Sequence, residues 1–186
     1  LGDIGPHAGM PVMEGKALIF KYLGGVDAFP ICLATKDPEE IIQAVKWLEP
    51  TFGGINLEDF SKPKCFHILD TLRKEMPIPV WHDDQQGTAA VILAGVINAL
   101  KVVGKKMNEA QFTIVGSGSA NTRTFYVLAS AGVNPKNVII VDNRGALHQN
   151  REDLKGTYKW DLALKTNPEM IEGGNKEAMK GSDIVL

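Results

Sequence analysis

Carboxylate side chains directly follow two short apolar segments of the sequence. Glu58 and Asp59 follow the first segment, and Asp84 follows the second. Carboxylate oxygens are the ligands that hard divalent cations prefer, and no histidine or cysteine set stands at the spacing of a zinc site. The pattern therefore predicts a Mg²⁺ or Mn²⁺ site made by Glu58, Asp59 and Asp84. Acidic residues in these places could instead cap the helices that follow them.

A glycine-rich turn stands between a predicted strand and a predicted helix. Such a turn lets the backbone N–H groups at the helix N-terminus approach a pyrophosphate. The predicted dinucleotide-binding residues are Gly116, Ser117, Gly118, Ser119, Ala120 and Asp142. Asn121 occupies the third glycine position, where we expect it to loosen the packing of the helix on the strand. The same turn without a ligand would be an ordinary connection between a strand and a helix.

Asp142 ends the next predicted strand, about twenty residues after the glycine turn. An acidic residue in this place accepts hydrogen bonds from the ribose hydroxyls of the adenosine, so NAD is favoured. Arg144 follows two residues later and could instead meet a 2′-phosphate, so NADP stays open.

Lys16 stands where an apolar helical stretch is expected to begin. A helix N-terminus and a nearby divalent cation both favour the neutral form of a lysine, and a neutral amine is a general base. A solvated lysine paired with Glu14 explains the same residue and is the more common case.

Alternating strands and helices must position these groups. We expect helices over 38–50, 63–76, 87–103, 119–131 and 160–165, and strands over 55–57, 78–81, 112–115, 137–141 and 182–186. This alternation is typical of a parallel sheet, in which ligands collect outside the carboxyl ends of the strands. The acidic pairs Glu58–Asp59 and Asp83–Asp84 would then face one crevice.

The composition limits the classes of partner. The 186 residues carry 20 basic and 22 acidic side chains, so the net charge of −2 gives no electrostatic reason to expect nucleic acid or an anionic membrane. We identify no segment with the apolar length of a membrane helix. The two cysteines lack metal or redox spacing, which favours a reducing, cytoplasmic setting. The chain begins without methionine and ends as a strand begins, so we expect an internal fragment of a longer protein.

Several motifs in this order resemble the malic enzymes in their short bacterial and archaeal form. The matching stretches are 1–5, 11–17, 25–28, 55–59, 82–89 and the glycine turn from Gly116. The resemblance implies an α/β fold: the C-terminal part of a catalytic domain over 1–104, then the N-terminal part of a Rossmann-type NAD(P)-binding domain over 105–186. It also implies a homodimer or a higher homo-oligomer.

The resemblance further implies the chemistry of each group. Lys16 matches the general base, which takes the proton of the malate C2 hydroxyl while hydride leaves for the nicotinamide. Asp83 matches a carboxylate close to that base. Glu58, Asp59 and Asp84 match the metal ligands of an oxidative decarboxylase that releases pyruvate and CO₂.

Two features of the family fall outside the sequence. Its tyrosine general acid lies upstream of Leu1, and its asparagine-rich substrate and nicotinamide loops lie beyond Leu186. Gln86 stands where short forms often carry histidine. A second hypothesis is therefore a truncated, non-catalytic homologue that binds nucleotide as a module of a larger assembly. A phosphoryl-transfer enzyme is disfavoured because the chain has no phosphate-binding G-x-x-x-x-G-K motif.

Overall fold

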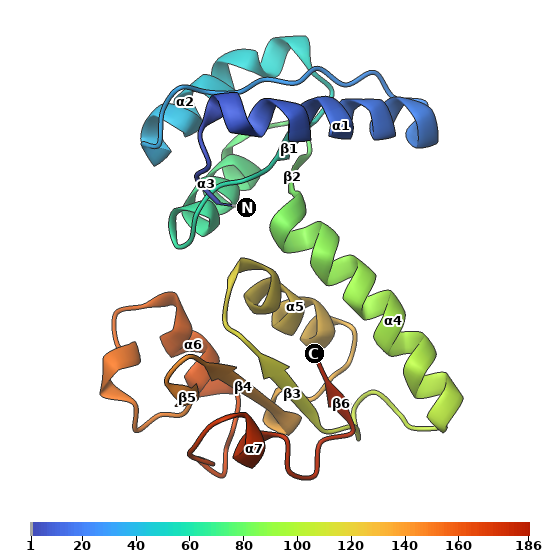
Figure 1. The fold of residues 1–186 in the computed structure, drawn as a ribbon, viewed down its shortest axis with the longest axis vertical. Coiled ribbons are helices and arrows are strands. Elements are labelled where there is room, and N and C mark those ends of the chain that lie inside the picture. Colours follow the sequence, from blue (N-terminus) through green and yellow to red (C-terminus); the bar gives the residue numbers. More distant parts are fainter. Residues whose placement is uncertain (1) are drawn as a thin grey trace. The chain divides into compact units, whose positions relative to one another are not determined.

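The computed structural model describes residues 2–186 of the chain (Figure 1). By packing, the chain forms two compact units, one ending at His82 and the other beginning at Asp83. Each unit combines helices with a sheet, which confirms the expected mixed α/β fold. The expected domain boundary at 104/105 stays a prediction, because a packing unit need not coincide with a family domain.

The first unit places three helices beside a two-stranded sheet. Its elements are α1 (Pro6–Gly24), α2 (Pro38–Leu48), a 3₁₀ turn (Glu49–Thr51), β1 (Ile55–Leu57), α3 (Lys64–Glu75) and β2 (Val80–His82). β1 and β2 are parallel, with Leu57 opposite His82, as the alternation of strands and helices predicts. The helices α2 and α3 pack on this sheet with side chains that are almost entirely buried. This core comprises Ile41, Ile42, Val45, Leu57, Ile68, Leu69, Leu72 and Val80.

The start of α2 shows why the sequence folds locally as expected. The Asp37 side chain accepts hydrogen bonds from the N–H groups of Glu39 (2.8 Å) and Glu40 (3.1 Å), and Pro38 occupies the first helical position. These features satisfy N–H groups that have no partner inside the helix. The helix then turns its apolar side toward the core.

The helix α1 begins ten residues before Lys16, although the sequence predicts that it begins at Lys16. It starts at Pro6 and continues through Pro11, so Lys16 lies in its interior rather than at its N-terminus. The expected effect of a helix N-terminus on Lys16 is therefore wrong. Pro11 and Gly15 thus lie inside the helix, although both residue types are rare in helix interiors.

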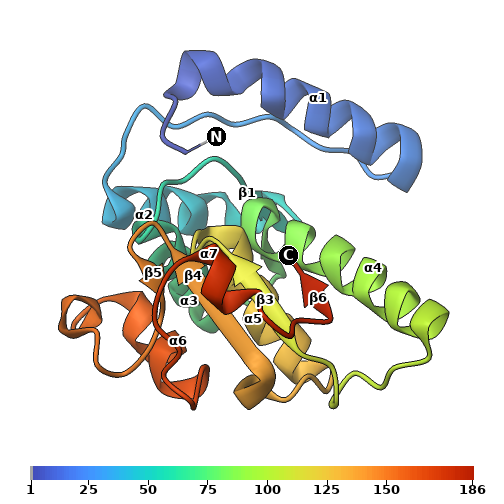
Figure 2. The ribbon, with the colours of Figure 1, turned by 60° about the horizontal axis from the view of Figure 1, so that its bottom comes forward.

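The second unit is built on a four-stranded sheet. Its elements are a π-helical turn (Asp83–Gly87), α4 (Thr88–Val103), β3 (Phe112–Val115), α5 (Ser119–Ser130), a 3₁₀ turn (Pro135–Asn137), β4 (Val138–Asp142), β5 (Gly145–Ala146), a 3₁₀ turn (Glu152–Leu154), α6 (Tyr158–Lys165), α7 (Asn175–Ala178) and β6 (Ile184–Val185). The strand order is β5-β4-β3-β6, with β5 antiparallel to β4 and the other pairs parallel (Figure 2). β3, α5 and β4 thus form the predicted βαβ unit.

A separate core lies between this sheet and its helices. Its largest buried side chains are Phe112, Ile114, Phe125, Leu128, Ile140, Leu147, Leu154 and Leu162. Val96 and Leu100 attach α4 to the same core. The second unit therefore buries its own apolar side chains rather than sharing those of α2 and α3.

The stretch Asp83–Val103 is long and apolar enough to cross a membrane by length and composition alone. An 18-residue part of this stretch has a mean hydropathy of 1.6, and 17% of that part is buried. The expectation that no segment would qualify is therefore corrected. One such helix is weak evidence for a membrane span, since core helices of soluble proteins pass the same test.

Candidate functional site

The parallel strands β1 and β2 bring two acidic segments to their carboxyl ends. Leu57 pairs with His82, and the next residues along the chain are Glu58 and Asp83. Asp59 adopts a left-handed backbone conformation, with φ of 57°. This conformation is uncommon for a residue with a side chain and occurs often where a site fixes the backbone.

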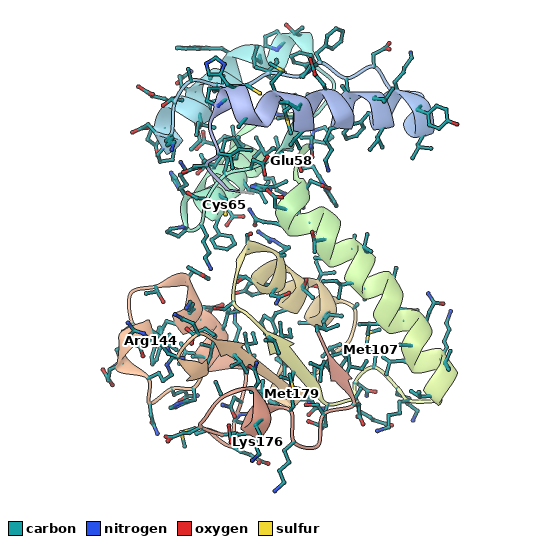
Figure 3. The ribbon with its side chains drawn as sticks, in the orientation of Figure 1. Glu58, Cys65, Met107, Arg144, Lys176 and Met179 are labelled. Atoms are coloured by element: carbon teal, nitrogen blue, oxygen red, sulfur yellow. The ribbon has the colours of Figure 1, made fainter. Side chains whose placement is uncertain are left out.

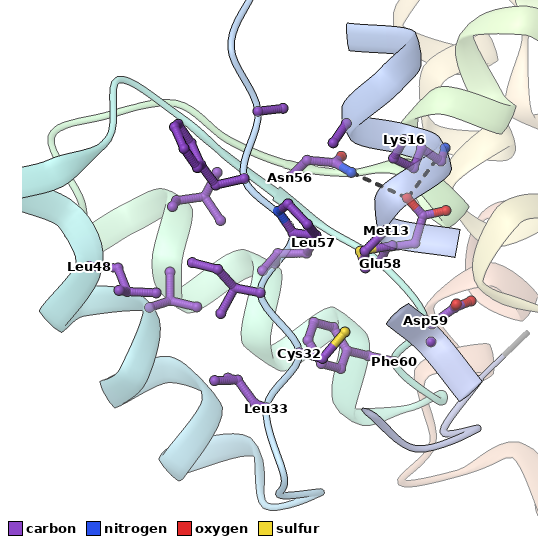
Figure 4. Close-up of a pocket in the computed structure, with 18 of the residues that line it drawn as sticks. Met13, Lys16, Cys32, Leu33, Leu48, Asn56, Leu57, Glu58, Asp59 and Phe60 are labelled. Atoms are coloured by element: carbon purple, nitrogen blue, oxygen red, sulfur yellow. Dashed lines mark hydrogen bonds and ion pairs between the residues drawn. The ribbon is translucent and has the colours of Figure 1, made fainter. Parts of the chain in front are cut away.

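Glu58 is held from two sides inside the first unit. Its Oε2 lies 3.3 Å from Lys16 Nζ and accepts a hydrogen bond from Asn56 Nδ2 at 3.2 Å (Figure 4). The Glu58 side chain is only 7% exposed, whereas that of Lys16 is 29% exposed. Two residues that the sequence analysis singled out, one from α1 and one from the end of β1, are thus brought into contact. Burial strengthens their attraction, because little water screens the pair.

A cavity of about 1010 Å³ opens beside this pair. Lys16, Glu58 and Asp59 border it, and most of its other lining is apolar (Figure 4). Asn56 also lines it, and its Oδ1 is buried with no hydrogen-bond partner. A mostly apolar cavity with a few convergent polar groups is the usual form of a small-molecule site. The first unit therefore contains a candidate active site.

The other acidic pair lies at the start of the second unit. Asp83 and Asp84 belong to the π-helical turn that precedes α4, a conformation found frequently at functional sites. A Cβ atom added at Gly87 would overlap the Asp83 carboxylate, so this carboxylate packs directly on the glycine. Gln85 is fully buried, and its Oε1 accepts a hydrogen bond from Arg123 Nη2 of α5 at 3.2 Å.

The alternative that these acids stabilise a helix start stays open for Asp83 and Asp84, which lie in the first turn of the helical segment that continues into α4. The N-cap residues of α3 and α4 are Pro63 and Gly87, and neither N-cap makes a side-chain capping bond. The N-cap positions of α3 and α4 themselves thus carry no acidic side chain.

The expected metal ligands are divided between the two units. Glu58 and Asp59 lie in the first, and Asp84 lies in the second. Across residues 2–186, no three His, Cys, Asp or Glu side chains form a group that could hold a metal ion. The donors themselves, half-buried or buried carboxylates, fit Mg²⁺ and Mn²⁺ by chemistry.

The glycine turn connects β3 to α5 in the second unit. Gly116 has a φ of 98°, which favours glycine, and Gly118 is the N-cap residue of α5 without a side-chain cap. Asn121 does not loosen the turn as expected. Its Nδ2 donates hydrogen bonds to the carbonyl oxygens of Val115 (2.8 Å) and Gly116 (3.1 Å), which closes the turn over the end of β3.

Tyr158 is a further contact of this turn that sequence reasoning missed. Its hydroxyl donates a hydrogen bond of 2.7 Å to the carbonyl oxygen of Ser117. No local motif indicates this contact, because Tyr158 follows Ser117 by 41 residues and reaches it only through the fold. The turn is thus held on both sides by side chains from helices α5 and α6.

Asp142 is engaged by cationic groups of its own unit. It accepts hydrogen bonds from both terminal nitrogens of Arg151 (2.8 and 3.3 Å), from Lys159 Nζ (2.5 Å) and from the backbone N–H of Arg144 (2.9 Å). Burial alone would raise the pKa of Asp142, but the bonds from Arg151 and Lys159 outweigh it and lower the pKa to about 2. A ribose hydroxyl would therefore compete with two cations for this carboxylate.

The chain is similar to known proteins over its whole length. The family model described as "Malic enzyme, N-terminal domain" matches residues 1–73, and "Malic enzyme, NAD binding domain" matches residues 85–179. The "NAD-dependent malic enzyme" of Geobacillus stearothermophilus is 52% identical over all of this chain, which spans 38% of that relative. The "NADP-dependent malic enzyme" of Haemophilus influenzae is 41% identical, and the chain spans 24% of it.

A solved structure is similar throughout the chain. The malic enzyme from Pyrococcus horikoshii matches with a TM-score of 0.95 and 53% identity, covering all of this chain and 44% of that one. The chain thus spans less than half the length of each of these relatives.

Proposed function

Since the chain belongs to the malic enzyme family, we propose that it carries part of the machinery for the oxidative decarboxylation of malate. The reaction yields pyruvate and CO₂ and reduces NAD or NADP. The observation that supports it most directly is the contact between Lys16 and Glu58 beside the cavity of the first unit. A base and a carboxylate meet there at the carboxyl end of a parallel sheet, where α/β enzymes bind substrates.

We assign Lys16 the role of general base. Its Nζ would take the proton of the malate C2 hydroxyl as hydride passes from C2 to the nicotinamide, which leaves a C2 carbonyl. The buried carboxylate of Glu58 keeps the ammonium in place after the transfer, because an opposite charge stabilises it. Asp83 would be the second carboxylate near the base.

Glu58, Asp59 and Asp84 would hold the divalent cation, Mg²⁺ or Mn²⁺. Their carboxylate oxygens suit these ions, and Glu58 and Asp59 directly follow β1. When bound, such an ion supplies a Lewis acid that polarises the C2 carbonyl while the C4 carboxyl group leaves as CO₂.

Replacing Asp84 with alanine tests this assignment. We expect malate-dependent reduction of NAD or NADP, followed at 340 nm, to require Mn²⁺ in the purified protein. Asp84→Ala should abolish both the rate and its metal dependence, because one carboxylate ligand is lost. Unchanged, metal-dependent turnover in Asp84→Ala would reject the ligand set.

The alternative of a non-catalytic nucleotide-binding module has its own outcome in this experiment. Protein that binds NAD or NADP and Mn²⁺ but does not turn over malate under any of these conditions would favour the module. Glu152→Gln is a suitable control variant, because this exposed carboxylate pairs with Lys155 in a surface contact.

The surroundings of Asp142 favour NADP as the cofactor, whereas the sequence favours NAD. Lys159 and Arg151 already occupy the carboxylate. We assign Lys159 as a contact of a 2′-phosphate, with Arg144, whose side chain is 70% exposed and is labelled in Figure 3, as a second one. Lys159→Gln should therefore weaken NADP binding about tenfold, the scale of one charge-assisted hydrogen bond. NAD binding should change little. Lys155→Gln, at an exposed lysine of the same unit, is the control.

A titration of both cofactors into each variant measures the preference. Equal losses of NAD and NADP affinity in Lys159→Gln would mean that Lys159 orders the pocket without reading the 2′ position. A loss of NAD affinity alone would show that Lys159 serves NAD, the cofactor that the sequence favours.

We also propose a homodimer or higher homo-oligomer in the cytoplasm. The helix α1 carries large apolar side chains that are 55–83% exposed: Leu18, Ile19, Tyr22 and Leu23. Exposed apolar side chains gathered on one element are typical of protein–protein contact surfaces. Neither Cys32 nor Cys65 forms a disulfide within the described residues, in keeping with a reducing compartment. Light scattering at several protein concentrations measures the oligomeric state.

A further inference from the structure

Asp3 lies on the loop before α1 and contacts the segment that follows Asp59. Its Oδ1 accepts a hydrogen bond from the backbone N–H of Ser61 at 3.0 Å, and its Oδ2 accepts one from the Ser61 hydroxyl at 2.8 Å. The Oδ2 also lies 2.8 Å from Lys64 Nζ. We call Asp3, Ser61 and Lys64 the Asp3 anchor.

The anchor joins three segments that are far apart in sequence. Lys64, in the first turn of α3, also donates a hydrogen bond of 2.6 Å to the carbonyl oxygen of Lys36, just before α2. The side chains of Asp3 and Lys64 are 22% and 17% exposed, so water screens their ion pair only partly. The loops before α1 and α2 are thereby fastened to the start of α3.

The segment fixed in this way contains the left-handed residue of the candidate site. Ser61 follows Asp59 by two residues, and both its backbone N–H and its hydroxyl are bound by the same carboxylate. A non-glycine residue keeps a left-handed conformation only where its surroundings determine the backbone on both sides. On one side, β1 is paired with β2, and on the other the anchor holds Ser61.

The anchor also connects this turn to the helix that carries the base. Asp3 precedes α1 by a few residues, and Lys16 of α1 contacts Glu58 at the border of the cavity. Fastening the start of α1 to Ser61 therefore limits how far Lys16 and Glu58 can move apart. Asp3 also lines the cavity that this pair borders.

We propose that Asp3 is a positioning residue, which through Ser61 and Lys64 sets the geometry of the Glu58–Asp59 carboxylates for a divalent cation. The proposal rests on the proposed function, because it assumes that these carboxylates bind the metal. Groups that orient ligands without touching the metal commonly change metal affinity by 10–100-fold when they are replaced.

The test compares Mn²⁺ affinity and local hydrogen exchange in variants of the full chain. Asp3→Asn keeps the shape of the side chain but removes its charge and one of its two acceptor oxygens. We expect Mn²⁺ to bind at least about tenfold more weakly. We also expect faster amide exchange over residues 58–61 than in the unchanged chain.

A second pair of variants keeps the test valid if Asp3→Asn folds poorly. Ser61→Ala loses only the hydroxyl bond to Asp3 and should weaken Mn²⁺ binding in the same direction, whereas Ser61→Thr retains a hydroxyl and should restore it. Glu75→Gln is the matched control, because Glu75 is also paired with a lysine, Lys46, in the first unit but lies away from the cavity.

The outcomes separate this proposal from the proposed function. If the unchanged chain binds Mn²⁺ and both Asp3→Asn and Ser61→Ala bind it equally well, the positioning role is overturned. If the unchanged chain binds no Mn²⁺, the metal site of the proposed function fails. In that case unaltered exchange over 58–61 in Asp3→Asn would overturn the anchor as well, while faster exchange would retain it as an organiser of the turn.

Discussion

Glu58 and Asp142 are both buried acidic side chains at the ends of parallel strands, yet their surroundings give them different uses. Asp142 accepts four hydrogen bonds, three of them from cationic side chains, so a ligand reaches it only by displacing one of these donors. Glu58 borders a large cavity and contacts Lys16 and Asn56. Glu58 is therefore suited to chemistry with a small substrate, and Asp142 to arranging cations around a cofactor.

Gly87 gives a residue-scale prediction about Asp83. A methyl group at position 87 would overlap the Asp83 carboxylate, which is the movable end of a side chain. Gly87→Ala should therefore displace this carboxylate without unfolding the turn. We expect turnover to fall at least about tenfold, as for a misplaced catalytic group, while the melting temperature stays within a few degrees.

Gly95→Ala is the matched control for this prediction. Gly95 lies in the middle of α4 with no atom within 4 Å of an added Cβ. Alanine there should leave turnover unchanged and stabilise the helix by up to about 1 kcal/mol. Normal turnover in Gly87→Ala would show that the position of the Asp83 carboxylate is unimportant for the reaction.

At the scale of elements, the turn between β3 and α5 depends on side chains as much as on glycines. Asn121 bonds two carbonyl oxygens at the end of β3. Asn121→Ala leaves them without this donor, so we expect a loss of about 1–2 kcal/mol in the free energy of unfolding and weaker binding of NAD and NADP alike. Chemical denaturation and a cofactor titration measure the two effects.

The control for Asn121→Ala is Asn137→Ala in the same unit. Asn137 also donates an amide hydrogen bond to a backbone carbonyl, that of Asn108, but at an exposed site away from the turn. It should lower stability slightly and leave cofactor binding unchanged. Equal effects of both variants on cofactor binding would contradict a special role of Asn121.

The sequence predicted the regular elements well and their long-range contacts poorly. The strands β1 and β3 lie where the apolar runs indicate, and α2 begins at the expected Asp37–Pro38 signal. These features depend on local patterns that each segment carries itself. The cations around Asp142 could not be foreseen, because Arg151 lies in a loop and Lys159 in α6, and both reach Asp142 only through the packing of the fold.

At the scale of the whole molecule, the chain divides its apolar side chains between two separate cores. Leu72 is fully buried in the core of the first unit, and Leu162 is fully buried in that of the second. Each core contains side chains from both the sheet and the helices of its own unit. Each unit therefore has the interior that a separately melting domain needs.

This division predicts that the two units lose their structure in separate steps. Leu72→Ala and Leu162→Ala each remove a buried side chain, so each should lower the stability of its own unit by about 2–5 kcal/mol. Calorimetry should show two transitions, and each variant should shift only one of them. Cofactor should protect the transition that Leu162→Ala shifts, because the glycine turn lies in the second unit. A single transition that both variants lower equally would show instead that the units unfold together, and the proposed metal ligands on either side of His82 would then belong to one cooperative structure.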